Sequence, residues 1–306
     1  MVVGLSSSPF NTVFCGCFMI LLLGGNGYVG SAIQKNLVGR NIPFVVASRS
    51  AANYSQLSVL VKMLRELRPE FLINAAGYTG KPNVDACEIH RTECLDGNAT
   101  LAGVIRAACE QTQTPWGHVS SGCIFTGAKE AGAGFTEEDD PNFSFRQNNC
   151  SFYSGTKALG EELLQGAEQC FLWRLRIPFN EVDSPRNYIS KMMRYDRLLM
   201  ATNSLSQLDE FANACVDSWL QRIPFGTYNL TNPGSVTTKD VIRLILKHRL
   251  SEKSFQFFDS DEQFMQLAAK TPRSNCVLDS GKAIAAGLQL TPVEDALETA
   301  MRNWKR

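Results

Sequence analysis

The chain has 306 residues, of which 44% are hydrophobic and 20% are charged, an ordinary composition for a globular protein. Lys and Arg together number 30, as do Asp and Glu, so the formal net charge is zero. A neutral chain has no global field to hold a polyanion, which argues against nucleic-acid binding. The ten cysteines and three histidines show no paired ligand spacing, so we predict no metal site.

The apolar run from Val13 to Leu23 fits either the core of a signal peptide or a buried first strand. No Lys or Arg precedes Lys35, so the basic start of a signal peptide is missing. Since the run also passes directly into a glycine-rich turn, we predict a strand and assign residues 1–16 to an N-terminal extension. We expect no membrane span and, because most cysteines lie in apolar runs that suit reduced thiols, a cytoplasmic protein.

Short apolar runs alternate with helical patterns along the first 175 residues. Strands are predicted at residues 18–23, 44–48, 71–74, 117–120 and 170–175, and helices at 31–37, 56–67, 92–112 and 153–168. Alternation of this kind is typical of βαβ units and predicts an α/β fold, a Rossmann-like doubly wound parallel sheet with helices on both faces. Ligands bind such sheets beyond the carboxyl ends of the strands.

Beyond residue 176 the pattern is less regular and is interrupted by prolines. We predict helices at residues 208–221, 238–250 and 291–304, and a strand at 226–230. We therefore divide the chain into a Rossmann domain at 17–180, with a return segment at 206–235, and a smaller C-terminal α/β lobe formed by 181–205 and 236–306. The lobe is expected to cover the ligand edge of the sheet and to bind the substrate.

A glycine-rich turn joins the first strand to the first helix, with the sequence Gly24-Gly25-Asn26-Gly27-Tyr28-Val29-Gly30. It contains the spacing G-x-G-x-x-G, which in this setting is typical of dinucleotide binding. The glycines permit a tight turn and close approach of the backbone to a pyrophosphate, and the helix N-terminus supplies N–H donors. The alternative is an ordinary glycine-rich turn. We predict a dinucleotide site formed by these seven residues.

The end of the second predicted strand indicates which dinucleotide is bound. NAD sites usually place a carboxylate there to bind the ribose hydroxyls. Here the strand ends in Ala47-Ser48-Arg49-Ser50 and carries no carboxylate. An arginine flanked by hydroxyls suits a 2′-phosphate, so we predict NADPH rather than NAD, with Arg49 as its contact. The alternative is a solvated surface arginine.

Tyr153 and Lys157 stand four residues apart at the start of a predicted helix, which puts both side chains on one face. Reduction of a ketone needs a proton for the developing alkoxide, and a tyrosine supplies it when a neighbouring ammonium lowers its pKa. Ser121, at the end of the fourth predicted strand, is placed to hydrogen-bond the same oxygen. Alone the pair fits a surface contact, but with the glycine turn and Ser121 we predict a reductase triad.

These motifs resemble those of the extended short-chain dehydrogenases/reductases that act on nucleotide sugars, over roughly residues 19–306. Asn74-Ala75-Ala76-Gly77 is similar to the family motif that lines the path of the cofactor. Asn98 resembles the family's structural asparagine on the fourth helix. The resemblance also implies that Lys157 holds the nicotinamide ribose and that the protein is a homodimer.

A closer resemblance is to the nucleotide-rhamnose epimerase/reductases, the C-terminal part of plant rhamnose synthases, with further similarity to dTDP-4-dehydrorhamnose reductases. The stretches that carry it are 74–88, 122–125, 141–143, 151–157, 185–191, 228–234 and 272–275. This resemblance implies an NADPH-dependent 3,5-epimerase/4-reductase that converts UDP-4-keto-6-deoxy-D-glucose to UDP-L-rhamnose. Whether the nucleotide is UDP or dTDP stays open at this point.

The chemistry of epimerisation asks for two further groups. A 4-keto group acidifies the protons on C3 and C5, and inverting each centre needs a base on one ring face and an acid on the other. Cys123, two residues after Ser121, and Lys191, beyond the sixth strand-like run, are our candidates, and the family resemblance points to the same pair. The alternatives are a buried inert thiol and a lysine that is solvated or pairs with a phosphate.

The nucleotide of the substrate needs cationic partners for its phosphates. Arg273 resembles the family's diphosphate contact, Arg186 and Asn187 are further candidates, and Lys81 and Asn83 are expected to line the sugar site. Two alternative functions stay open: a 4-reductase without epimerase activity, and a non-catalytic NADP-binding regulatory subunit on the same fold.

Overall fold

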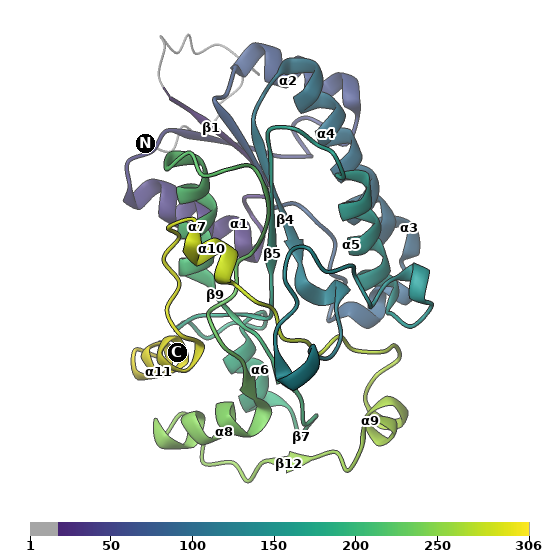
Figure 1. Cartoon of the computed structure of the whole chain (residues 1–306), viewed down its shortest axis with the longest axis vertical. Helices are drawn as coiled ribbons and strands as arrows, with labels where there is room; N and C mark the ends of the chain where they lie inside the picture. Colours follow the sequence, from purple (N-terminus) through teal and green to yellow (C-terminus); the bar gives the residue numbers. More distant parts are fainter. Residues whose placement is uncertain (1–17, 306) are drawn as a thin grey trace.

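A computed structural model describes residues 18–305 of the chain, so the predicted N-terminal extension of residues 1–16 lies outside the described residues (Figure 1). At its centre is a six-stranded sheet, all of whose pairings are parallel, in the order β10-β5-β4-β3-β1-β2. The strands are β1 (Ile20–Leu23), β2 (Phe44–Ala47), β3 (Phe71–Asn74), β4 (Trp116–Ser121), β5 (Cys170–Leu175) and β10 (Gly226–Asn229). The predicted doubly wound sheet is confirmed.

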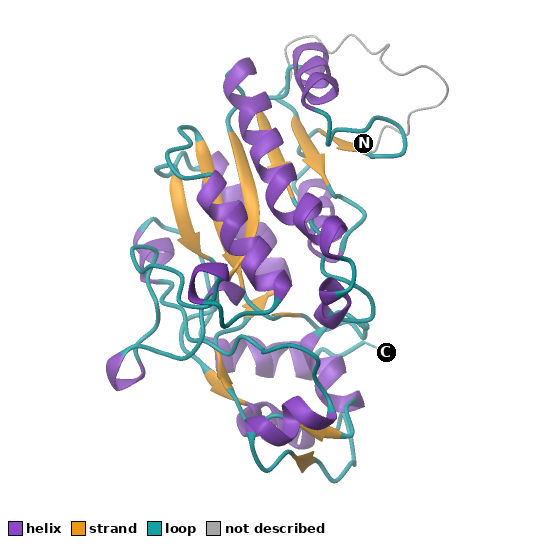
Figure 2. Ribbon diagram, turned by 90° about the vertical axis from the view of Figure 1, so that its right-hand side faces the viewer, coloured by secondary structure: helices purple, strands orange, loops and turns teal. Residues whose placement is uncertain are grey.

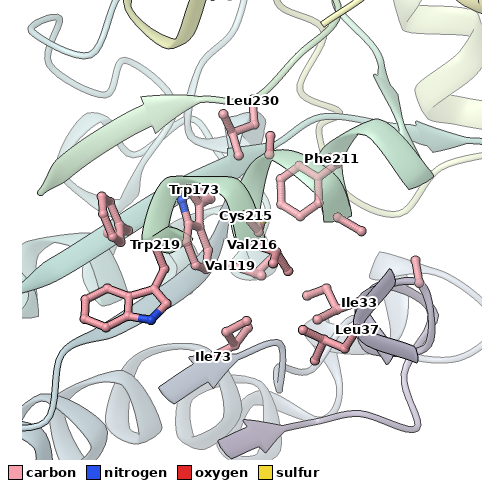
Figure 3. Packing of buried hydrophobic residues seen from close by; sticks show 14 of the residues in the cluster. Ile33, Leu37, Ile73, Val119, Trp173, Phe211, Cys215, Val216, Trp219 and Leu230 are labelled. Atoms are coloured by element: carbon pink, nitrogen blue, oxygen red, sulfur yellow. The ribbon is translucent and has the colours of Figure 1, made fainter. Parts of the chain in front are cut away.

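Helices cover both faces of this sheet because its strands are apolar on both sides. In β1, Ile20 and Leu22 belong to one core cluster, while Leu21 and Leu23 belong to another. The first cluster is covered by α1 (Tyr28–Gly39) and α7 (Leu208–Leu220), as Figure 3 shows for Ile33 of α1 and for Phe211 and Val216 of α7. The second is covered by α2 (Leu57–Leu67) and α4 (Leu101–Thr112), while α5 (Phe152–Leu163) packs beside α4.

The chain leaves the sheet after β5 and later returns to it. The short strand β6 (Pro178–Phe179) leads out, and β9 (Ser206–Gln207), which pairs with β6, leads back into α7. Then β10 adds to the sheet in parallel with β5. A second return follows, because α10 (Gly281–Ala285) packs against β10 and its Ala283 lies in the same core as α7. The range 236–306 thus contributes to both parts of the molecule.

The remaining elements form a smaller lobe beyond the carboxyl ends of the strands (Figure 2). Its core, which contains Phe179, Ile189, Val241 and Leu297, joins the three helices α6 (Tyr188–Arg194), α8 (Thr238–Lys247) and α11 (Val293–Arg302). Its other elements are β7 (Arg197–Leu198) with β12 (Gln256–Phe257), β8 (Thr202–Asn203) with β11 (Val236–Thr237), and α9 (Asp261–Leu267).

The long helix predicted at 92–112 is wrong in one respect, since it is interrupted. It consists of α3 (Arg91–Leu95), a π-helical turn at 96–100, and α4. The turn lets the buried Asn98 reach the backbone of Tyr78, and the absence of a side chain at Gly160 gives it room, because a Cβ there would lie 2.4 Å from the Asn98 carbonyl oxygen. Such π-turns are frequent at functional sites.

Two absences can be stated for residues 18–305. No helix in this range is both long and apolar enough to cross a bilayer. Its His, Cys, Asp and Glu side chains also form no group that could hold a metal ion.

Candidate active site

A cleft of about 1400 Å³ lies between the carboxyl edge of the sheet and the lobe. Its walls include the glycine turn, the ends of β3, β4 and β5, the start of α5, and segments of the lobe. Among the predicted site residues, it is lined by Asn26, Gly27, Tyr28, Val29, Ala75, Ala76, Lys81, Asn83, Ser121, Cys123, Tyr153, Lys157, Arg186, Lys191 and Arg273. The sequence predictions therefore converge on one cleft.

The glycine turn forms a close-packed cradle at one end of this cleft. Gly24 has a positive φ of 72°, and a Cβ there would lie 2.4 Å from the amide nitrogen of Ala76. A Cβ on Gly30 would lie 2.2 Å from the carbonyl oxygen of Gly24. Gly25 is similarly confined, because a Cβ there would lie 2.7 Å from Cγ1 of Val46. These three glycines shape the turn, while Asn26 to Val29 face the cleft. The start of α1 at Tyr28 directs free backbone N–H groups here, so the cradle fits a pyrophosphate.

The end of β2 carries a cation outside the cleft lining. The guanidinium of Arg49 lies 5.6 Å from the ring centroid of Tyr54, and the hydroxyl oxygens of Ser48 and Ser50 are 2.7 Å apart. Within residues 18–305, Arg49 forms no ion pair with a carboxylate. Its exposed guanidinium therefore suits an incoming phosphate, although its role in NADPH binding stays a prediction.

Asn74 holds the motif after β3 in place instead of facing the cleft. Its Oδ1 accepts a hydrogen bond from the amide nitrogen of Ala76 at 3.0 Å, and its Nδ2 donates to Nδ1 of His118 at 2.9 Å. Burial, with the nearby charge of Lys157, lowers the pKa of His118 well below its ordinary value. A neutral imidazole is thus available as the acceptor that orients Asn74.

The reductase triad assembles where β4 ends beside α5. Ser121 ends β4, Tyr153 and Lys157 lie on the first two turns of α5, and Lys157 Nζ donates to the carbonyl oxygen of Val119 at 3.1 Å. Burial, with the charge of Cys123, raises the pKa of Tyr153 well above its ordinary value against a hydrogen bond from Ser121. Burial also lowers the pKa of Lys157.

These pKa directions correct one expectation about the triad. The sequence led us to expect that the ammonium lowers the pKa of the phenol, but in the buried site the cost of charging the phenol is the dominant effect and raises its pKa. Tyr153 is therefore a protonated phenol in this state, which is the form that a proton donor needs.

Asn98 links the triad helix to the loop after β3. Its Oδ1 accepts from Tyr78 N at 2.9 Å, and its Nδ2 donates to Tyr78 O at 2.9 Å and to Thr156 Oγ1 at 3.2 Å. Thr156 lies between Tyr153 and Lys157 in sequence. The hydrogen bonds of Asn98 therefore hold the loop and the helix together.

Cys123 lies two residues after the triad serine, in a short 3₁₀ turn at Gly122–Ile124. Its side chain belongs to the same buried cluster as Tyr153 and Ala158, and its amide donates to Ser121 Oγ at 3.2 Å. Burial raises the pKa of the thiol, while Ser121 and the charges of Lys157 and Arg176 oppose that rise. The thiol and the phenol thus share one pocket wall.

Lys191, on α6, approaches the cleft from the lobe. Burial, with the charge of Arg186, lowers the pKa of its ammonium. Asn187, in contrast, is absent from the cleft lining and is fully buried. Its Oδ1 caps α6 by accepting from Ile189 N at 3.0 Å, and its Nδ2 donates to Asn180 O and Val182 O. The substrate contact predicted for Asn187 is therefore wrong, and this residue shapes the segment that carries Lys191.

The two candidate phosphate arginines are engaged with the loop after β3. Arg186 donates to Thr79 Oγ1 at 2.7 Å. Arg273 forms a two-pronged ion pair with Asp85, with Nη1–Oδ1 at 2.7 Å and Nη2–Oδ2 at 2.8 Å. Lys81 and Asn83, which lie in the same loop between Thr79 and Asp85, also line the cleft. The arginines are thus placed at the cleft but already hold protein partners.

Comparison with protein families gives a match to the RmlD substrate binding domain over residues 18–306. The chain belongs to this family. A bifunctional dTDP-4-dehydrorhamnose 3,5-epimerase/dTDP-4-dehydrorhamnose reductase of Arabidopsis thaliana is 31% identical over 96% of this chain and 93% of its own length. A trifunctional UDP-glucose 4,6-dehydratase/UDP-4-keto-6-deoxy-D-glucose 3,5-epimerase/UDP-4-keto-L-rhamnose-reductase of the same plant is 30% identical. The match covers 90% of this chain but only 41% of the length of that relative.

Two solved structures share this fold. The UDP-rhamnose synthase L780 from Acanthamoeba polyphaga mimivirus superposes with a TM-score of 0.85 at 24% identity, covering 94% of this chain and all of that one. A dTDP-4-dehydrorhamnose reductase from Bacillus anthracis in complex with NADP superposes with a TM-score of 0.77 at 18% identity, covering 94% and 98%. At these identities the likeness shows the fold.

Within this member of the RmlD substrate binding domain family, the sequence analysis missed several residues of the cleft. Arg176, after β5, and Tyr188, on α6, line it, as do Phe258 and Phe264. Burial raises the pKa of Tyr188 to about 12. Arg176 directly follows β5, so the rule that ligands bind at strand ends could have found it. The two phenylalanines carry no comparable signal.

Proposed function

We propose that this chain is an NADPH-dependent 3,5-epimerase/4-reductase that converts UDP-4-keto-6-deoxy-D-glucose to UDP-L-rhamnose. The observation that carries the proposal is the shared cluster of Cys123 and Tyr153, with Lys191 on the lobe side of the same cleft. A pocket that serves both reactions needs a proton-transfer pair for carbon and a proton donor for oxygen around one ring. The plant relatives whose names combine both activities support this assignment.

The first reaction uses the thiol and the amine. One group removes the proton from C3 or C5, and the resulting electron pair is delocalised onto the 4-keto oxygen. The other group delivers a proton to the opposite ring face of the same carbon, which inverts the centre. Both groups lie largely out of water. Burial lowers the pKa of the Lys191 ammonium, which makes its proton easier to release than in solution, whereas burial raises the pKa of the Cys123 thiol.

The second reaction uses the triad. Tyr153 donates its proton to the 4-oxygen, Ser121 hydrogen-bonds that oxygen, and Lys157 supplies positive charge beside the phenol. The glycine turn and Arg49 would hold NADPH, which when bound supplies a hydride to C4. Ala75 and Ala76 border the same part of the cleft and present no bulky side chain to the cofactor.

The test separates the two reactions with one variant each. In heavy water, Cys123→Ala should lose deuterium incorporation at C3 and C5 yet still oxidise NADPH with a ketone that has already been epimerised. Tyr153→Phe should show the reverse, with exchange retained and NADPH oxidation lost. Sugar NMR reports the exchange and absorbance at 340 nm reports the reduction. Unchanged exchange in Cys123→Ala would remove Cys123 from the mechanism.

A second candidate is a 4-reductase without epimerase activity. It is favoured by the raised pKa of Cys123, which keeps the thiol protonated, and by the fold shared with dTDP-4-dehydrorhamnose reductases. Starting from the unepimerised UDP- or dTDP-4-keto sugar, this enzyme would form no L-rhamnose. A non-catalytic NADP-binding subunit is disfavoured because Tyr153 and Lys157 both line the cleft. NADPH binding without oxidation on either ketone would favour it.

A further inference from the structure

Arg176 is a buried cation whose hydrogen-bond partners are all neutral. Its side chain is 5% exposed, and Nη2 donates to Asn203 Oδ1 and to the carbonyl oxygen of Ser274, each at 2.5 Å. Within residues 18–305 it forms no ion pair with a carboxylate. Arg174, two residues earlier, is equally buried but pairs with Glu161 at 2.8 Å. Burying a charge without an opposite charge is strongly unfavourable, so we expect Arg176 to be paired with an anion that forms during function.

The side chain of Arg176 lies next to the turn that carries Cys123. Nε of Arg176 is buried and has no hydrogen-bond partner. The Cδ of Arg176 lies 3.5 Å from the position that a Cβ on Gly122 would take. Both Arg176 and Cys123 line the cleft, and the positive charge of Arg176 acts to lower the pKa of the thiol. The guanidinium thus keeps an unsatisfied donor, and its side chain lies beside the turn that carries a group that can become an anion.

The other groups around Cys123 do not offer this permanent charge. The polar and titratable groups around it are Ser121 on its own segment, Tyr153, Ser154 and Lys157 on α5, Cys150 in the loop before α5, and Cys276, which packs in the same cluster. Lys157 is the other cation, and its charge acts on the thiol more strongly than that of Arg176, but burial lowers its pKa and its Nζ is bonded to Val119 O. A guanidinium stays charged at any working pH, since its pKa exceeds about 12.

We propose that Arg176 is the fixed counter-charge of the thiolate form of Cys123. The inference rests on the proposed function, in which Cys123 and Lys191 exchange protons with C3 and C5, and it adds Arg176 as the residue that positions negative charge on the thiol. The thiolate takes the proton from C3 or C5, and the electron pair of that C–H bond moves onto the 4-keto oxygen. The Lys191 ammonium then gives a proton to the opposite face of the carbon. Solvent takes the thiol proton and restores the lysine proton.

The experiment measures the ionisation of Cys123 directly, in the full-length protein and without substrate. The rate of iodoacetamide modification at Cys123 is followed against pH by peptide mass spectrometry, because the thiolate is the reactive form. Arg176→Gln removes the charge and keeps amide donors. Its midpoint should move toward alkaline pH by about one to three pH units, the usual effect of a close opposite charge. Arg176→Lys should restore most of the wild-type midpoint.

Two further variants separate charge from packing. Asn203→Asp keeps the acceptor at Oδ1 but places a carboxylate against Arg176, so it should also move the midpoint toward alkaline pH. This variant tests the proposal even where Arg176→Gln fails to fold. Arg186→Gln is the matched control, since this second cleft arginine bonds Thr79 instead. A folded Arg176→Gln or Asn203→Asp protein with the wild-type midpoint would overturn the proposal.

Enzyme activity provides a second readout, which separates failure of this proposal from failure of the proposed epimerase function. Arg176→Gln should lower deuterium exchange at C3 and C5 by more than tenfold, while reduction of the epimerised ketone changes little. Equal loss of both activities would assign Arg176 a merely structural role and overturn the proposal. If the wild-type protein exchanges no deuterium, the proposed epimerase function fails, whereas the modification midpoints still decide whether Arg176 controls the thiol.

Discussion

The two walls of the cleft are built in different ways. On the sheet wall, the functional groups are held by contacts within the Rossmann part: Gly24 packs on Ala76, Asn74 bonds His118, and Lys157 bonds Val119. On the lobe wall, the cations reach across to the loop after β3, where Arg186 bonds Thr79 and Arg273 pairs with Asp85. The sheet wall is thus held by its own contacts, while the lobe arginines would have to exchange protein partners in order to bind the phosphates proposed for them.

This difference separates two kinds of residue. A group fixed by its own fold should respond to mutation through stability or cofactor binding. A group that must exchange partners should respond through substrate affinity, and removing its protein partner should help rather than harm. The following predictions test that division, beginning with the largest expected effect.

The first prediction concerns the ion pair beneath the sheet wall. Glu161 Oε2 lies 2.8 Å from Arg174, both side chains are buried, and Ser120 Oγ donates to the same carboxylate. Glu161→Gln leaves Arg174 without its counter-charge, so the free energy of unfolding should fall by about 3–5 kcal/mol. Glu162→Gln is the matched control, because the next residue on α5 pairs with the largely exposed Arg146. Urea unfolding measures both, and equal effects would contradict this account.

The second prediction concerns the glycine cradle. Gly30→Ala places a methyl group 2.2 Å from the carbonyl oxygen of Gly24, so the turn must shift. Such overpacking costs about 1–3 kcal/mol, and NADPH affinity should fall by roughly tenfold to hundredfold if the distortion appears in binding. Gly39→Ala, at the other end of α1 with nothing within 4 Å, should stabilise the protein by up to about 1 kcal/mol. Fluorescence titration with NADPH and urea unfolding report the two effects.

The sheet wall could be predicted from sequence because its signals are local. Gly24 to Gly30, and Tyr153 with Lys157, each lie within one turn or one helix, and strand order brings the segments to one edge. The interruption at Asn98 could not be predicted, since its partner Tyr78 is 20 residues away and the helical periodicity continues through it. The ion pair of Arg273 with Asp85 could not be predicted either, because the two residues are 188 positions apart in the sequence.

Asn187 illustrates a third limit of sequence reasoning. Its position before a lysine and beside an arginine resembles a polar ligand site. In the structure, Asn187 instead satisfies the backbone of its own turn, which is a common use of asparagine at a helix start. A polar residue that caps a helix and one that binds a ligand look alike until the backbone donors are placed.

The third prediction concerns the choice of cofactor. Arg49→Ala removes an exposed guanidinium at the end of β2. A charge-assisted hydrogen bond contributes about 1.5–3 kcal/mol, so NADPH affinity should fall by roughly tenfold to hundredfold. NADH lacks the 2′-phosphate, so its affinity should stay the same. Arg40→Ala, which removes a cation paired with Asp217, is a suitable control. Equal losses for both cofactors would place Arg49 outside the 2′-phosphate site.

The fourth prediction is the smallest and tests the lobe wall. Asp85→Asn should lower the KM for the nucleotide sugar a few-fold with kcat unchanged, because Arg273 is released from a partly exposed ion pair and no longer has to exchange partners. Partial burial raises the pKa of Asp85, but the hydrogen bonds and charge of Arg273 outweigh it, so the net pKa lies below the ordinary value.

The sign of that pKa shift fixes the pH dependence of the effect. A carboxyl whose pKa is lowered in the folded state contributes its stabilisation fully above the unfolded pKa of about 3.9, and loses it as pH falls through the lower folded value. From about pH 6 to about pH 8 the ion pair is intact, so the ratio of the wild-type and Asp85→Asn KM values should not vary with pH. A higher KM in Asp85→Asn would mean that Asp85 positions Arg273 for the phosphates, and that the lobe wall is as prebuilt as the sheet wall.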